Sequence, residues 1–320
     1  MNTNFKKLLV PAAVALSIGV NAPVHAGAIA MADLAIIAFG LVDAVSGDPL
    51  TNVATILTDS RTGIASSNYN GIEGTGIGLG SIASFTPGAT VDVKKRCAGA
   101  DCATIDTIYG GSAENNTLTH LTTPPVGNFA LGDMFISGNI LGASGAQGLT
   151  RADASADYAT NSGGSSATII NAATASILLA VSADVQAKLA VSYNVFVTAF
   201  LDAFLPGESG QAGAGTTFSV TVTSNGTNGD SLFSTLVFNP TELNTGYTAT
   251  NSTENSTFSQ VGTLLSDTRT LKAGKQYQLT ISQSSNALVQ LVPEPTSMML
   301  LGAGLLGMGA TVRRRVAKSA

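Results

Sequence analysis

The chain has 320 residues, of which 44% are hydrophobic and only 11% are charged, and its formal net charge is −5. A chain of this length forms one large domain or two small ones. The low charge and high apolar content argue against an intrinsically disordered protein. The acidic balance argues against a nucleic-acid-binding protein, because such proteins need a basic surface. With so few charges, the surface must be hydrated mainly by Ser, Thr, Asn, Gln and Gly.

The first 26 residues have the features of a secretory signal peptide. Lys6 and Lys7 provide a positively charged start, an apolar run follows over residues 8–20, and the segment ends at Ala26 with small side chains. This order is typical of signals that are removed during export. We expect cleavage between Ala26 and Gly27. The alternative is a buried N-terminal helix.

Two glycine-rich segments lie in the first half of the remaining chain. Glycine alternates with other residues over 74–80, and six glycines lie within 137–166. We expect loops between strands, or strands that neighbouring strands approach closely. The spacing over 74–80 does not fit a dinucleotide- or phosphate-binding loop, which argues against nucleotide binding.

The only two cysteines, Cys97 and Cys102, are five positions apart. An exported protein meets an oxidising compartment, so we expect a disulfide that closes a small local loop. A zinc site would need four ligands, whereas His120 is the only histidine after the signal peptide. A redox-active pair is the remaining alternative.

The candidate catalytic chemistry is sparse. Nucleophilic catalysis normally needs a base, and His120 is more typical of a surface or strand histidine. The acid pairs Asp153/Asp157 and Asp101/Asp106 could serve a glycosidase or bind calcium. Carboxylates on loops are more often solvated charges, so we assign no catalytic residue, no metal site and no cofactor. Calcium binding stays an open alternative.

The second half of the chain alternates apolar and polar residues with a period of two, which is typical of half-buried strands. We expect one long strand over 183–205, with a bend or bulge near Phe196 because large residues occupy both faces there. The alanine-rich segment 168–184 keeps a helical alternative open. Further strands are expected over 217–223 and 231–238, and a final hairpin is expected from 274–282 and 287–292 with its turn at 283–286. Together these segments predict an all-β domain over 27–292, an antiparallel β-sandwich of jelly-roll-like type.

The C-terminal residues 293–320 form a three-part tail. An apolar span of fifteen residues reaches only about 22 Å as a helix, short of the ~30 Å hydrocarbon core of a membrane, so it is a weak permanent anchor. The arginines after it favour a cytoplasmic end. The residues of the tail are Pro293, Glu294 and Pro295, the span 298–312, and Arg313, Arg314 and Arg315.

This tail resembles the PEP-CTERM sorting signal of Gram-negative bacteria. The resemblance implies that the tail inserts transiently into the inner membrane and that a membrane enzyme, the exosortase, removes it as the protein passes to the cell surface or extracellular matrix. The alternative is an ordinary single-pass anchor. The resemblance covers less than a tenth of the chain and transfers no catalytic residue to the rest.

Removal of both ends makes the protein more acidic. Nine basic and nineteen acidic residues lie within 27–292, which gives a formal charge of about −10. Such a surface disfavours nucleic acid and favours divalent cations or cationic polymers. We therefore expect a non-enzymatic surface or matrix protein associated with exopolysaccharide, biofilm or floc. The alternatives are a carbohydrate- or calcium-binding adhesin and a secreted hydrolase.

Overall fold

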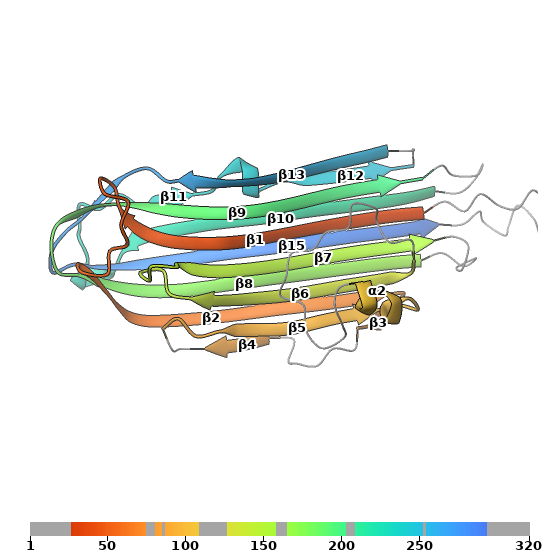
Figure 1. Ribbon diagram of the computed structural model, residues 1–320, viewed down its shortest axis with the longest axis horizontal. Coiled ribbons are helices and arrows are strands. Elements are labelled where there is room, and N and C mark those ends of the chain that lie inside the picture. Colours follow the sequence, from red (N-terminus) through yellow and green to blue (C-terminus); the bar gives the residue numbers. More distant parts are fainter. Residues whose placement is uncertain are drawn as a thin grey trace, which may run out of the picture.

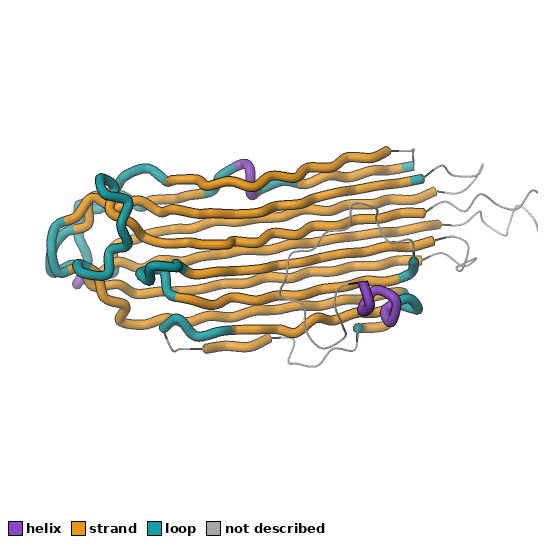
Figure 2. Tube along the Cα trace, in the orientation of Figure 1, coloured by secondary structure: helices purple, strands orange, loops and turns teal. Residues whose placement is uncertain are grey.

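The structure is a computed structural model. It describes residues 27–74, 81–84, 87–108, 127–157, 165–202, 209–251 and 254–292. Nearly all of the regular structure in these ranges is β-strand, and every strand pair is antiparallel (Figures 1 and 2). The all-β class predicted from the sequence is confirmed.

Seven described strands form one sheet, which we call sheet A. Their order is β13-β9-β1-β7-β6-β5, and β14 also pairs with β9. The strands are β1 (Gly27–Asp43), β5 (Val91–Ala98), β6 (Phe129–Gly138), β7 (Ala146–Asp157), β9 (Val185–Leu201), β13 (Glu254–Leu265) and β14 (Arg269–Leu271).

Eight described strands form the second sheet, sheet B. Their order is β11-β10-β15-β8-β2-β3, with β12 paired to β10 and β4 paired to β2. The strands are β2 (Ala54–Tyr69), β3 (Ile72–Glu73), β4 (Ser81–Ser84), β8 (Ser165–Val181), β10 (Ser209–Ser224), β11 (Leu236–Phe238), β12 (Gly246–Thr250) and β15 (Gln276–Val292). The short helices are α2 (Cys102–Ile108), η1 (Gly226–Asn228) and η2 (Thr241–Leu243).

The two sheets stack face to face as an elongated sandwich (Figure 1). The longest strands have 17 residues, which corresponds to about 55 Å of extended chain. Alternate residues of each long strand face the other sheet and form one continuous hydrophobic core. This is the arrangement that the period-two pattern predicts.

Alanine dominates the core near the end of the sandwich where β1 begins. Three alanines of β1 lie opposite three alanines of β7 in the strand register, and all six are at most 1% exposed. Small side chains let the two sheets approach closely at this end, whereas Leu34, Phe39 and Leu41 fill the core farther along β1. The alanines are Ala28, Ala30, Ala32, Ala152, Ala154 and Ala156.

The same use of alanine explains why the helical alternative for 168–184 is wrong. Residues 168–181 of that segment lie in β8, and Ala173, Ala175 and Ile177 alternate inward with a period of two. The high helix propensity of alanine is overridden here because the sandwich needs small buried residues. For the glycine-rich segment 137–166, where loops or closely approached strands were expected, the structure shows the twelve-residue strand β7 over 146–157.

β9 confirms the long strand predicted over 183–205 but carries no bulge at Phe196. The pairing of β9 with β13 is continuous, and the register shift lies instead on β1, between Ile36 and Ala38. Phe196 packs with Ile29 and Met31 on the outer face of sheet A. The large residues on both faces of β9 therefore reflect a second apolar cluster and not a bend.

The predicted C-terminal hairpin is also wrong, because 276–292 form the single strand β15 without a turn. Gln283 and Ser285 point into the core, where Gln283 Nε2 donates to the carbonyl oxygen of Leu34 at 2.7 Å. The Ser285 and Thr150 hydroxyls lie 2.8 Å apart. Gln283 and Ser285, which lie in the predicted turn, thus connect the two sheets by hydrogen bonds.

Two further expectations need correction. The strand predicted over 231–238 is confirmed only at β11, because Asp230 Oδ1 accepts the backbone N–H of Leu232 and holds a turn there. The connectivity also differs from a plain jelly roll, in which the strands form two Greek keys. β5, β6 and β7 instead form a meander within sheet A.

Candidate functional site

Of the residues predicted to direct export and sorting, the structure describes only Gly27. Gly27 is the first residue of β1, and Val292 is the last residue of β15. Both lie at the same end of the sandwich (Figure 1). The other predicted residues of this set lie outside the described ranges: Ala26, Pro293, Glu294, Pro295, Arg313, Arg314 and Arg315.

Cys97 and Cys102 form a disulfide, with 2.10 Å between the sulfurs. It connects the second-to-last residue of β5 to the first residue of α2. Both cysteines pack beside Ile105, Phe129 and Leu131. The disulfide thus fixes α2 against β6 on the outer face of sheet A. His120 lies outside the described residues.

Asp101 and Asp106 are not the solvated charges that we expected. Asp101 Oδ2 accepts the backbone N–H of Asn128 at 2.7 Å. Asp106 Oδ1 lies 2.8 Å from Lys95 Nζ, and the Lys95 side chain is only 2% exposed. The two carboxylates therefore connect α2 and the residue before it to Asn128 and to Lys95 on β5.

Asp153 and Asp157 also differ from the expectation of loop carboxylates, because both belong to β7 and Asp153 is fully buried. Four residues along a strand separate them by about 13 Å. Paired glycosidase carboxylates lie about 5–9.5 Å apart, so these two do not form such a pair. In the part of the chain that the structure describes, no group of three or more acidic, His or Cys side chains could hold a metal ion.

Arg151 lies in a buried charge cluster on the outer face of sheet A. Its Nε is 3.3 Å from Asp33 Oδ1 and 3.6 Å from Asp153 Oδ2. Asp133 on β6 lies opposite Arg151 on β7 in the strand register. The four residues of the cluster are at most 1% exposed. Charges removed from water need close partners of opposite charge, and Asp33 and Asp153 have such a partner in Arg151. The cluster was not predicted, because it becomes visible only once the strand register brings its members together.

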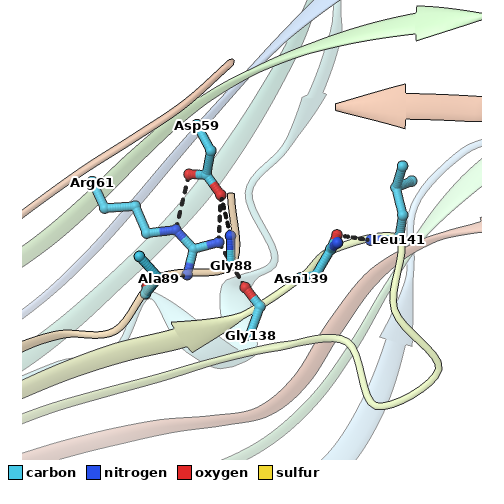
Figure 3. Close-up of polar contacts among 7 residues, drawn as sticks. All are labelled: Asp59, Arg61, Gly88, Ala89, Gly138, Asn139 and Leu141. Carbon is cyan, nitrogen blue, oxygen red and sulfur yellow. Dashed lines mark hydrogen bonds and ion pairs between the residues drawn. The ribbon is translucent and has the colours of Figure 1, made fainter. Parts of the chain in front are cut away.

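A second buried pair, Asp59 and Arg61, lies between the sheets (Figure 3). Arg61 Nε and Nη2 donate to Asp59 Oδ1 and Oδ2 at 2.9 and 2.7 Å. Arg61 also donates to the carbonyl oxygens of Ala89 at 3.0 Å and Gly138 at 2.6 Å. The Gly88 backbone N–H donates to Asp59 Oδ2 at 3.0 Å. Arg61 therefore ties β2 of sheet B to the chain before β5 and at the end of β6 in sheet A.

A groove of about 480 Å³ lies on the outer face of sheet B, along β10 and between β12 and β15. We call it the β10 groove. Its floor contains Gly213, which pairs with Thr248 on β12 and Leu288 on β15, and Gly215, which pairs with Asn286 on β15. Because neither glycine has a Cβ, the floor is open. A Cβ at Gly213 would meet Thr248 Oγ1 at 3.7 Å.

The β10 groove lies in an uncharged part of the protein. β8, β10 and β15 contain no charged residue, and none of the groove's lining residues is charged. The outer face of these strands presents hydroxyl and amide groups such as Ser176, Thr217, Gln278 and Ser284. Gln278 Nε2 donates to Ser176 Oγ at 2.7 Å, and the Thr217 and Ser284 hydroxyls lie 2.7 Å apart.

Three connections at the opposite end of the sandwich, at the end of β1, between β8 and β9 and between β14 and β15, contain side chains with a shifted pKa. The Ala273 backbone N–H and then Lys272 lower the pKa of the Asp184 carboxyl. The hydrogen bond to Asp184 in turn raises the pKa of Lys272. The Ser46 and Val45 backbone N–H groups lower the pKa of Asp43. These carboxylates stabilise turns and bear no arrangement typical of catalysis.

None of the helices in the described residues is long and apolar enough to cross a membrane. The span 298–312, which we expected to insert transiently, lies outside those residues.

The comparisons with known proteins identify one feature of the chain. Residues 291–315 match the family model described as the PEP-CTERM protein-sorting motif. The match begins within the last two residues of β15 and extends to Arg315. Searches of curated proteins and of solved structures found no match.

Proposed function

The chain carries a PEP-CTERM motif, the signal for export and exosortase processing, and from this premise we propose that it is a non-enzymatic protein of the cell surface or extracellular matrix that associates with exopolysaccharide. The observation that carries the proposal is the match over residues 291–315, directly after the last strand of the sandwich. The sorting motif thus follows the folded domain without an intervening domain.

The arrangement of the acidic residues supports a non-enzymatic role. Asp101 and Asp106 are engaged in contacts that hold α2, and Asp153 lies beside a buried arginine. A hydrolase or a calcium-binding adhesin would need carboxylates that converge on one accessible point. No observation on the described residues favours either function.

Fractionation of the producing cells tests the proposal. We expect the protein in the surface or matrix fraction of normal cells and in the inner membrane of an exosortase-deficient strain. A variant with Pro293, Glu294 and Pro295 all replaced by alanine should behave in normal cells as the unchanged protein does in the deficient strain.

The matched control replaces Pro240, which precedes η2 in the folded domain, with alanine. This variant should still reach the surface. The proposal is wrong if the variant without the Pro-Glu-Pro sequence reaches the matrix as efficiently as the control.

A further inference from the structure

We propose that the β10 groove binds a segment of a neutral polysaccharide. This inference rests on the proposed function, because it assigns a ligand class and a site to the association with exopolysaccharide. It is carried by the shape of the groove, by its free polar side chains and by the absence of charge in its lining.

The size and shape of the groove fit a chain-like ligand. Its volume of about 480 Å³ lies within the range of about 300–1,000 Å³ that is usual for ligand sites. Gly213 and Gly215 follow one another on the outer face of β10, so the groove runs along that strand. Glycine inside a strand weakens it and commonly marks a point where another molecule approaches the backbone closely.

The groove presents hydrogen-bonding groups that the protein itself does not use. Gln211, Thr248 and Asn286 line it, and among the described residues their side chains make no hydrogen bond to another residue. Thr217, which also lines the groove, bonds to Ser284, and farther along the outer face of sheet B Gln278 bonds to Ser176. The groove therefore combines amide and hydroxyl groups that are available to sugar hydroxyls with a hollow in this face. Leu288, half-buried beside them, offers an apolar contact for the carbon-bound hydrogens of a sugar ring.

Charge selects a neutral polysaccharide over an acidic one. None of the lining residues is charged, so the groove provides no cation to pair with a uronate, sulfate or phosphate group. The domain over 27–292 has a formal charge of about −10, which repels polyanions. A neutral chain meets neither obstacle.

Binding by the mature protein, purified from the surface fraction, tests this inference. The probe is the neutral part of the extracellular polysaccharide of the producing cells, separated by anion exchange, and the comparison ligand is polygalacturonate. We expect calorimetry to detect binding of the neutral polysaccharide and no binding of polygalacturonate.

Two variants locate the site. Gly213→Val fills the floor, and the nearest neighbours of a Cβ at this position, at 3.7 and 3.8 Å, are in ordinary van der Waals contact with it. Asn286→Ala removes one amide from the wall. Each should weaken binding about fivefold or more, because a lost hydrogen bond or a blocked floor acts directly on the ligand. The control is Thr280→Val, on the exposed outer face of β15 and outside the groove, and it should bind as the unchanged protein does.

Thermal unfolding of each variant shows whether the fold is retained, and Asn286→Ala, at an exposed position, serves if Gly213→Val does not fold. The inference is overturned if the neutral polysaccharide does not bind, if polygalacturonate binds equally well, or if both groove variants bind as the control does. Such results from a protein found at the surface leave the proposed function intact. A protein retained in the inner membrane contradicts the proposed function instead.

Discussion

Arg61 lies between the two sheets and donates four hydrogen bonds, two to Asp59 and two to backbone carbonyl groups. Its side chain is 1% exposed and that of Asp59 is 0% exposed. Loss of one partner of such a pair leaves the other charge buried without compensation. The pair is therefore more important to stability than its position near one edge of sheet B suggests.

We predict that Arg61→Met lowers the free energy of unfolding by about 3–5 kcal/mol. The double variant Asp59→Leu/Arg61→Met should lose less than Arg61→Met alone, because it removes both buried charges together. Urea unfolding followed by circular dichroism measures the three free energies. Lys272→Met is the control, since the Lys272 and Asp184 side chains are 51% and 57% exposed and exposed pairs contribute little. An equal effect of Arg61→Met and Lys272→Met would contradict this account.

The Asp184 carboxyl provides a second residue-scale prediction. Its pKa is lowered in the folded protein, so its contribution to stability is complete above its ordinary pKa and is lost as the pH falls through the lowered value. Because the Ala273 backbone N–H is the larger cause, the pKa of Asp184 should stay below its ordinary value in Lys272→Met. NMR titration of the carboxyl measures this directly. A return to the ordinary value would show that Lys272 is the main cause.

Buried charges illustrate what the sequence does not reveal at this scale. Asp59 and Arg61 are two positions apart in a strand, so they share a face, but the sequence alone does not show whether that face is inward. Asp33 and Arg151 are distant in sequence and meet only because β1 pairs with β7 in this register. Cys97 and Cys102 differ from them, because their separation is short enough for the pairing to be expected from spacing and compartment.

At the scale of elements, strands were predicted well where apolar residues alternate without interruption. β9 and β10 are examples, although β10 begins eight residues before the strand expected at 217–223. β15 was divided wrongly into a hairpin, because Gln283 and Ser285 are polar at inward positions. Gln283 and Ser285 form hydrogen bonds to Leu34 and Thr150, which belong to the opposite sheet. A short stretch of sequence does not reveal partners that are so distant along the chain.

Hydrogen exchange tests this correction. We predict that the backbone N–H groups of 283–286 exchange as slowly as those of 279–282, because both segments pair on both sides, with β8 and β10. Backbone N–H groups of the loop 230–235 serve as the exposed comparison. Exchange of the backbone N–H groups of 283–286 at the rate of that loop would support the predicted hairpin and contradict the single strand β15.

At the scale of the whole molecule, the boundary of the sorting motif and the β10 groove involve different residues of the sandwich. Gly27 and Val292 lie at one end, where the expected signal peptide and the sorting motif adjoin the fold. The β10 groove lies on the outer face of sheet B and contains neither residue. Sequence patterns revealed the sorting motif because sorting signals are contiguous. The groove depends on the pairing of β10, β12 and β15, so it required the structure.

The central claim is that the C-terminal tail is a processing signal for a surface protein. The most direct measurement is the intact mass of the protein isolated from the surface fraction, together with its C-terminal peptide. We predict a mass that lacks the segment containing Arg313, Arg314 and Arg315, and a full-length C-terminus in an exosortase-deficient strain. A surface protein that retains Arg313 to Ala320 in normal cells would contradict the account.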